Sequence, residues 1–501
     1  MVLILKLEHL LLVLKQLSKF KTMKINKIIY SISVSALFFT AVSCDRYLDT
    51  EPISDQTVDI NNPIATAGNA EEAMTTIYSD FGNEYWQLDY FLNGDSQTDI
   101  SYAGGDNVQN FQQDEYRILA TNTNVNRDWG YLSNFMDHCN KILNYVDGAE
   151  GLSTARKNQM KAEASIFRGM YLFHMVQLWG DVPVVTKSFI TINSENFNEA
   201  YTQLYPKRQS VNDVYAQIIS DLEGAIANAP ASSEKYKANK GTAYALLAKV
   251  YATKPNPDWA KVKEYSDLVI SQGYSLLPVY SHLFDSNHEA NVESIFEVNG
   301  NASNIWAWCT SMFVGTDWKK FNTPSNDLVK TFNDLGDTQR LNTTVKFSSV
   351  TWSDTYWASN NFPFMNKMRL IDGNQNFYIL RFADILLLKA EADIHFGNFS
   401  EAQTLINQVR SRVALPPITI TSEDDGINKV LSERKLELAF EGHRWFDLKR
   451  TGKAISILSQ QKNGNGAILP YAANINQNRL LWPIPQAQMD KNQNLTQNPG
   501  Y

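Results

Sequence analysis

The chain has 501 residues, 44% hydrophobic and 12% aromatic, which is enough to bury one large core or two to three smaller ones. It carries 53 acidic and 45 basic residues, a formal net charge of -8. This balance argues against a polyanionic partner such as nucleic acid, because phosphate binding needs clustered lysine and arginine. Three cysteines in so long a chain give no disulfide framework.

A basic and then apolar segment near the N-terminus is typical of a targeting signal. Residues 24–27 are basic, residues 28–43 carry no charge, and Cys44 follows directly. Because the uncharged run is shorter than the roughly 18–20 residues that span a bilayer, it predicts a cleaved signal peptide over 23–43. The small residues before Cys44 resemble the lipobox of bacterial lipoproteins, in which the cysteine becomes the lipid-bearing N-terminus. We therefore expect lipidation of Cys44.

The limits of the folded body follow from this signal. Residues 1–22 fit no leader, whereas Met23 begins a signal of ordinary length, so the upstream stretch is interpreted as a mis-called start. Residues 44–62 are polar and aperiodic, which predicts a short tether that anchors the protein to a membrane without spanning it. A single folded domain is then predicted over 63–501.

Helical periodicity dominates the first half of this domain. Residues 93–110 interrupt it with a glycine-rich, polar stretch that predicts a long loop, and loops of this length are usually functional or disordered. Apolar residues recur elsewhere at steps of three and four, which predicts helices over 69–92, 128–147, 162–179, 209–229, 240–253 and 258–272.

The pattern changes between about 280 and 380. Helical periodicity weakens, aromatic residues become frequent, and short apolar runs such as 294–298 predict isolated strands. This region is predicted to be an irregular, aromatic-rich insert within the helical scaffold.

The clearest element of the chain is residues 379–416. Helical spacing is broken at Gly397, resumes, and ends before Pro416-Pro417, which predicts two antiparallel helices joined by a tight turn. Small Ala390 and Ala402 lie where tetratricopeptide repeats place the residues that let paired helices touch. The predicted fold class is therefore mostly α, a tetratricopeptide-like helical-hairpin scaffold that carries the insert.

Five stretches, ordered and spaced consistently over the predicted mature chain, carry a recognisable set of motifs. They are SCDRYLDTEP (43–52), AEASIFRGMYLFHMVQLWGDVPVVT (162–186), LRFADILLLKAEA (380–392), SERKLELAFEGHRWFDLKRTGK (432–453) and WPIPQAQMDKNQNLTQNPGY (482–501). Together they resemble the SusD/RagB family of outer-membrane lipoproteins from Bacteroidota. The resemblance implies an α-α superhelix with an irregular ligand-binding half. It also implies a surface-exposed protein that captures oligosaccharides, or in some cases peptides, and passes them uncleaved to a SusC-like TonB-dependent transporter.

Aromatic residues are the most informative candidates for ligand contact. A sugar ring has an apolar face that stacks on an exposed Trp or Tyr, and large rigid aromatics lose little entropy on binding. Trp306 and Trp308 alternate across Ala307, so both would point the same way if this polar segment is extended. These two residues and Tyr102, in the predicted 93–110 loop, are the preferred binding platform.

Two further groups are weaker candidates for the same role. Asp95 and Asp99 lie close to Tyr102 in the sequence and could hydrogen-bond sugar hydroxyl groups. Trp352 and Tyr356 would share one face if 352–357 is helical.

Catalysis finds little support in the sequence. Glu433, Glu437 and Glu441 lie four residues apart on a predicted helix over 427–450 and could suggest acid–base chemistry. Arg434, Arg444 and Arg450 lie three positions from Glu437, Glu441 and Asp447, a spacing that favours ion pairs on a helix surface instead. No enzymatic activity is predicted.

Metal and cofactor binding are not predicted either. The histidines are scattered, and no HExxH or CxxC motif indicates a zinc or redox site. Asp95, Asp99 and Asp106 could bind a structural calcium ion, although their spacing does not fit an EF-hand. His174 lies on the apolar face of its helix and is interpreted as a core residue.

Three alternatives to glycan capture remain open. One is a peptide-capturing member of the same family, and another is a repeat adaptor that binds only proteins. The third is a glycosidase, which needs two carboxylates about 5–10 Å apart across a cleft.

Overall fold

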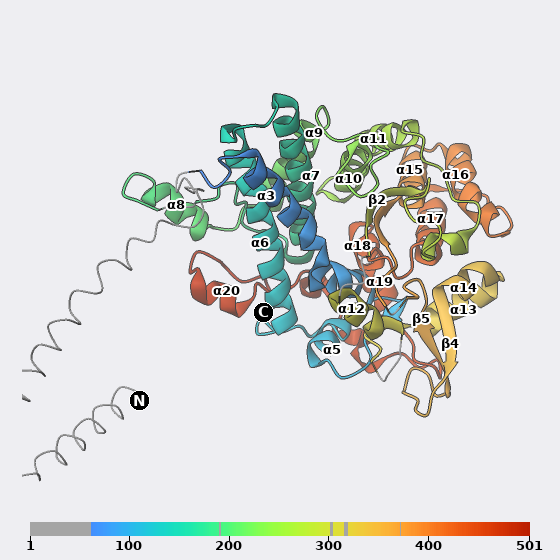
Figure 1. The fold of residues 1–501 in the computed structure, drawn as a ribbon. Helices are drawn as coiled ribbons and strands as arrows, with labels where there is room; N and C mark the ends of the chain where they lie inside the picture. Colours follow the sequence, from blue (N-terminus) through green and yellow to red (C-terminus); the bar gives the residue numbers. More distant parts are fainter. Residues whose placement is uncertain (1–61, 190–191, 301–303, 315–318, 371) are drawn as a thin grey trace, which may run out of the picture. The chain divides into compact units, whose positions relative to one another are not determined.

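Helices make up most of the described chain (Figure 1). The computed structural model describes residues 62–189, 192–300, 304–314, 319–370 and 372–501. The predicted start, signal peptide, lipidation site and tether (residues 1–61) lie outside these ranges. The described residues from 62 onward belong to one compact unit. Within them, no helix combines the length and apolar character needed to cross a bilayer.

Successive helices pack against one another along the scaffold, and most of the predicted helices are confirmed. Contacts join α6 to α7, α7 to α9, α10 to α11, α11 to α15, and α15 to both α16 and α17. These helices are α6 (Thr123–Tyr145), α7 (Thr154–Trp179), α9 (Val211–Ala225), α10 (Lys240–Thr253), α11 (Trp259–Ser271), α15 (Phe382–His395), α16 (Phe399–Arg412) and α17 (Glu423–Glu437).

Local sequence signals set the ends of these helices. Ser153 caps α7 by accepting a hydrogen bond from the Arg156 backbone N–H, and Gly180 ends it at a φ of 74°. In the α15–α16 hairpin, Ala390 and Ala402 are both fully buried, as expected for small residues at a close helix contact. The predicted tetratricopeptide-like pairing is therefore present.

Shorter elements complete the fold. They include α3 (Ala67–Ser79), α8 (Phe197–Leu204), α13 (Asn326–Leu335), α14 (Thr338–Thr344), α18 (Arg444–Arg450), α19 (Ala454–Leu458), α20 (Gln486–Lys491), and the short helical turns η1 (Asp80–Gly82), η3 (Val146–Gly148), η4 (Tyr280–Phe284), η5 (Pro470–Asn474) and η6 (Gln477–Leu480).

In the part of the chain that the structure describes, three small antiparallel sheets lie largely within the predicted insert. β2 (Ser294–Val298) confirms the predicted strand and pairs with β6 (Phe377–Arg381), so the chain from 379 begins as a strand and becomes helical at 382. The other pairs are β4 (Val345–Ser349) with β5 (Asn361–Met365) and β1 (Ser101–Tyr102) with β3 (Thr323–Pro324).

The prediction for residues 69–110, one helix followed by one long loop, is wrong in detail. The helix predicted over 69–92 is divided into α3, η1 and a π-helical turn, η2 (Tyr85–Asp89). The predicted 93–110 loop contains the end of α4 (Tyr90–Asp95), the strand β1 and the start of α5 (Val108–Asp114). Residues 93–103 are buried, so much of this stretch belongs to the interior.

The prediction of one helix over 427–450 is also wrong, because the helix ends at Glu437. Phe440 and Gly442 adopt left-handed φ angles of 63° and 77°, which a continuous helix does not allow. The turn brings two backbones together, since a Cβ atom added at Gly94 would lie 2.2 Å from the Gly442 carbonyl carbon. Glycine at both positions permits this contact.

A buried ion cluster links the segments around this turn. Arg381, at the end of β6, is 1% exposed and lies 2.8 Å from Glu293, 2.7 Å from Glu437 and 2.6 Å from Glu441. The cluster continues through Arg412 of α16 to Glu293 (2.7 Å), through Lys367 to Glu441 (2.6 Å), and through Arg340 of α14 to Glu433 (2.7 Å). For the three glutamates, the expected surface ion pairs are thus replaced by a buried network. The expected pair of Arg450 with Asp447 does form, at 2.9 Å, but it too is buried.

We expect Arg381→Ala to lower the free energy of unfolding by about 3–5 kcal/mol, because it leaves buried glutamates without their shared partner. Chemical denaturation of the full chain would measure the change. As a control, Arg117→Ala removes an arginine that is 47% exposed and paired with Glu115, and should cost less than about 1 kcal/mol. Equal effects of the two substitutions would show that the buried cluster is not a main support of the fold.

Candidate functional site

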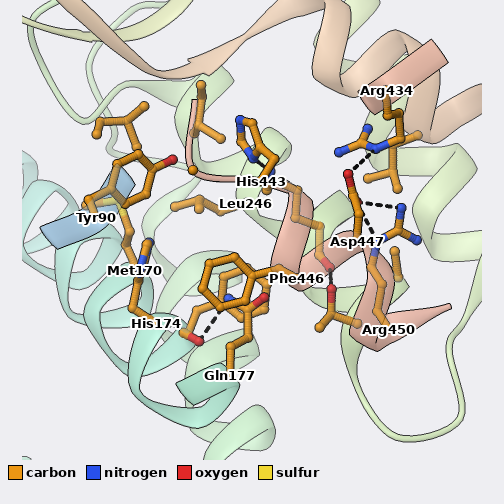
Figure 2. Close-up of a pocket in the computed structure, with 18 residues that line it drawn as sticks. Tyr90, Met170, His174, Gln177, Leu246, Arg434, His443, Phe446, Asp447 and Arg450 are labelled. Atoms are coloured by element: carbon orange, nitrogen blue, oxygen red, sulfur yellow. Dashed lines mark hydrogen bonds and ion pairs between the residues drawn. The ribbon is translucent and has the colours of Figure 1, made fainter. Parts of the chain in front are cut away.

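A small interior cavity lies between α7, α10 and α18 (Figure 2). Its volume of about 40 Å³ has room for water but not for a sugar ring. His174 lines it and hydrogen-bonds the Tyr85 hydroxyl at 3.1 Å. Burial lowers the pKa of His174 to about 3, so the ring is neutral at physiological pH. This confirms the interpretation of His174 as a core residue.

The charged residues beside this cavity bind one another. Figure 2 shows Asp447 between Arg434 and Arg450, with N–O distances of 2.8 and 2.9 Å. Arg450 also holds Glu391 at 2.6 Å. All four side chains are buried or nearly so, and the arrangement is typical of a structural network rather than of a ligand site.

A second hollow, of about 380 Å³, contains the one exposed tryptophan among the side chains that the structure describes. This is Trp308, on α12 (Asn304–Val314), with an exposed fraction of 45%. An indole that remains open to solvent beside a cavity can stack on an apolar ligand face. The hollow is therefore a candidate for ligand contact.

Carboxamide side chains line the same hollow. They come from the start of α5 and from α6, where Asn107 caps α5 and Asn124 donates a hydrogen bond to Asn110 Oδ1 at 2.8 Å. The buried Asn110 Nδ2 has no hydrogen-bond partner within the described residues. Amides both donate and accept, so this wall suits a ligand that carries hydroxyl groups.

The charged side chains of the Trp308 hollow pair with one another. Arg127 Nη2 lies 2.6 Å from Asp89, its Nη1 lies 2.9 Å from Glu84, and Lys319 lies 2.8 Å from Asp106. No excess of positive charge is left among these groups to favour an anion. The lining thus fits an uncharged polar ligand better than a phosphate or nucleic acid.

A larger groove, of about 880 Å³, collects aromatic residues from the insert and from the segment after α19. Tyr356 stacks on Tyr102 with ring centroids 3.8 Å apart, and its hydroxyl lies 2.6 Å from that of Tyr471. Tyr102 is only 3% exposed, because Tyr356 covers it. Half-buried Trp357 and several amides, including Asn326, Gln460, Gln461 and Asn463, complete the lining.

The structure separates the residues of the predicted platform. Trp306 and Trp308 lie in the helix α12, so the extended arrangement is wrong. The Trp306 side chain lies outside the described part of the chain. Trp308 and Tyr102 line different hollows, and they do not form one surface.

The second aromatic cluster also differs from the expectation. Residues 352–357 are not helical, so Trp352 and Tyr356 share no helix face. Trp352 packs against Phe362 at a centroid distance of 4.7 Å, and the Lys320 ammonium lies 4.6 Å from its ring. Only Tyr356 of this predicted pair lines the larger groove.

The two candidate aspartates, Asp95 and Asp99, bind other groups of the protein itself. Asp95 is fully buried and accepts a hydrogen bond from the Gly442 backbone N–H at 2.8 Å, so it is not available to a ligand. Asp99 borders the larger groove, but it is 6% exposed and pairs with Arg444 (2.8 Å) and Lys435 (3.0 Å). Among the described residues, neither aspartate belongs to a group that could hold a metal ion.

The chain is similar to known proteins over nearly its whole length. A sequence model of the SusD family matches residues 236–501, and a second model, described as starch-binding and associating with the outer membrane, matches residues 46–252. SusD-like protein P38 of Formosa agariphila is 26% identical and aligns over 97% of this chain and 100% of its own length.

Solved structures agree with this assignment at the level of fold. A SusD homologue from Bacteroides thetaiotaomicron superimposes with a TM-score of 0.73 at 22% identity, covering 89% of this chain and 99% of its own. Surface glycan-binding protein A from the same species gives a TM-score of 0.70 at 21% identity, covering 87% and 100%. The fold is thus that of the SusD superfamily. Because the family model matches more than half of its length, the chain belongs to the SusD family.

The buried state of Asp95 leads to a prediction about pH. Burial raises the pKa of Asp95 to about 7, so its contribution to stability is complete below its ordinary pKa and is lost as pH rises through about 7. We expect the free energy of unfolding of the wild type, minus that of Asp95→Asn, to fall by a few kcal/mol between pH 4.5 and 8.

Asp99→Asn provides the matched control for this measurement. Burial raises the pKa of Asp99, but the charges of Arg444 and Lys435 outweigh burial and hold that pKa below its usual range. Its contribution is therefore present at neutral pH and lost in acid, which is the opposite trend. A flat difference curve for Asp95→Asn would contradict the assignment of a protonated, buried Asp95.

Proposed function

We propose that this protein is a lipid-anchored glycan-binding protein of the outer membrane that passes its ligand to a SusC-like TonB-dependent transporter. The observation that carries the glycan assignment is the exposed indole of Trp308 in a hollow that is lined by carboxamides and has no excess of positive charge. A sugar needs this combination, because its apolar ring face stacks on an aromatic plane while its hydroxyl groups need donors and acceptors. The starch-binding description of the matching family supports the same ligand class.

Binding without cleavage is the second part of the proposal. Glu433, Glu437 and Glu441 are buried and held by arginine or lysine side chains, so they cannot approach a substrate. Burial raises the pKa of Glu437, but the surrounding arginines outweigh burial and hold that pKa below its usual range. It therefore stays ionised and cannot serve as a general acid.

The carboxylates that line the Trp308 hollow are also paired with basic side chains. Glu84 and Asp89 are both bound to Arg127, and Asp106 is bound to Lys319. A glycosidase needs a free acid and a free base or nucleophile on either side of the scissile bond. This arrangement supports capture of an intact glycan.

A binding screen tests the proposal. The full chain would be titrated calorimetrically with plant, algal and host glycans and with oligopeptides, and chromatography of each mixture would detect cleavage. We expect at least one glycan to bind and to be recovered intact. Shortened products would identify a glycosidase instead, and binding of peptides alone would assign the protein to peptide capture.

We expect Trp308→Ala to weaken binding of that glycan by about 10- to 100-fold, because truncating a central aromatic anchor typically costs 2 kcal/mol or more. Tyr201→Ala serves as the control, since Tyr201 is 50% exposed on α8 and lines none of the hollows described above. Calorimetry would compare the dissociation constants. If Trp357→Ala abolishes binding and Trp308→Ala does not, the larger groove is the site.

Loss of the proposed lipid anchor should move the protein out of the membrane fraction. Wild-type protein should fractionate with membranes and incorporate labelled fatty acid, because the acyl chains on a lipidated Cys44 would together anchor the body. Cys44→Ser should lose the label and leave the membrane fraction. Cys139→Ser, at a buried cysteine of the body, should retain both properties. Continued labelling of Cys44→Ser would refute lipidation at this position.

A further inference from the structure

Three potential metal ligands meet in the segment between η4 and β2. His282, Asp285 and His288 each offer one ligand atom, and these atoms all lie within 4.8 Å of one another. All three residues are half-buried, so solvent ions can reach them. We propose that they form a binding site for one divalent transition-metal ion of the zinc and copper class, separate from the glycan function.

The backbone that carries these ligands is well anchored. Leu283 and Phe284 are buried beside His282, and the Phe284 ring packs edge-on against Tyr378 with centroids 6.3 Å apart. On the other side of the turn, Asn291 Nδ2 donates a hydrogen bond to the His288 carbonyl at 2.8 Å. The backbone is thus held before any ion arrives and only the three side chains must rearrange, which lowers the cost of binding.

Asp285 and His288 already lie close enough to bind one ion together. The Asp285 Oδ1 atom lies 2.8 Å from His288 Nδ1 and also accepts the backbone N–H groups of Asn287 and His288. An ion would replace the proton that His288 Nδ1 and Asp285 share, so that both side chains can bind the same ion. The backbone hydrogen bonds on Oδ1 hold the carboxylate in place beside the imidazole.

The two imidazole rings are poised to bind a metal but do not yet converge. His282 and His288 stack with centroids 3.8 Å apart and an interplanar angle of 11°. Since a nitrogen lone pair lies in the plane of its ring, both rings must tilt toward a common ion. The present spread of up to 4.8 Å would contract to the roughly 3.3 Å expected for ligands in a tetrahedral zinc site, with water as the fourth ligand.

The donor set selects the class of ion. Two imidazole nitrogens and one carboxylate favour zinc and copper, whereas calcium prefers six to eight oxygen ligands. The spacing of three residues between successive ligands matches none of the standard zinc motifs, which is why the sequence pattern did not indicate it.

Metal titration of the full chain tests this site. The protein, purified without a histidine tag and stripped with EDTA, would be titrated with zinc chloride and copper chloride. We expect one ion per chain to bind with micromolar or tighter affinity, and His282→Ala and His288→Ala each to weaken binding at least about tenfold. Calcium chloride should not displace the ion.

His395→Ala is the matched control, because His395 also pairs with a carboxylate, Glu423, at 2.8 Å but lies outside the cluster. It should bind metal as the wild type does. Electron paramagnetic resonance of the copper complex should show two coupled nitrogens, reduced to one in either single variant. Circular dichroism would confirm that the variants fold. Absence of stoichiometric binding, or unchanged binding in the double variant His282→Ala/His288→Ala, would overturn the proposal.

Discussion

The buried ion cluster around Arg381 is the constraint on which the rest of the structure depends. A charge removed from water needs a partner nearby, so each arginine and glutamate in the cluster fixes the position of another segment. Arg381 joins β6 to the residue preceding β2 and to α17, and Arg412 ties α16 to the same glutamates. Glu441 extends the cluster into the turn between α17 and α18.

That turn also fixes the position of the larger groove. Its backbone donates to Asp95, and Arg444 holds Asp99. The Asp99 carbonyl in turn accepts from the Ser325 hydroxyl at 2.6 Å, which secures the β1–β3 pair beneath the larger groove. Buried charge in the scaffold is thereby connected to the irregular half of the molecule.

Much of the scaffold could be predicted from the sequence, because periodicity and end signals are local. The hairpin α15–α16 and the strand β2 show this directly. The failures came from long-range partners. Glu437 has the spacing of a surface ion pair, and nothing near it in sequence shows that Arg340, Arg381 and Arg412 surround it.

The candidate site was predictable only in part. The polar context of Trp308 correctly indicated exposure, although the segment is helical rather than extended. The carboxamides beside it, such as Asn107 and Asn124, gave no signal, because asparagine is common on surfaces and only the fold brings these residues to Trp308. Conversely, Asp95 looked like a loop acid because its burial depends on contact with the distant Gly442 turn.

A crystal structure of the full chain with a bound oligosaccharide tests the central claim most directly. The account predicts a sugar ring stacked on the indole of Trp308, with hydroxyl groups within hydrogen-bond distance of the carboxamides from α5 and α6. An oligosaccharide bound only in the larger groove, or elsewhere with the Trp308 hollow empty, would contradict it.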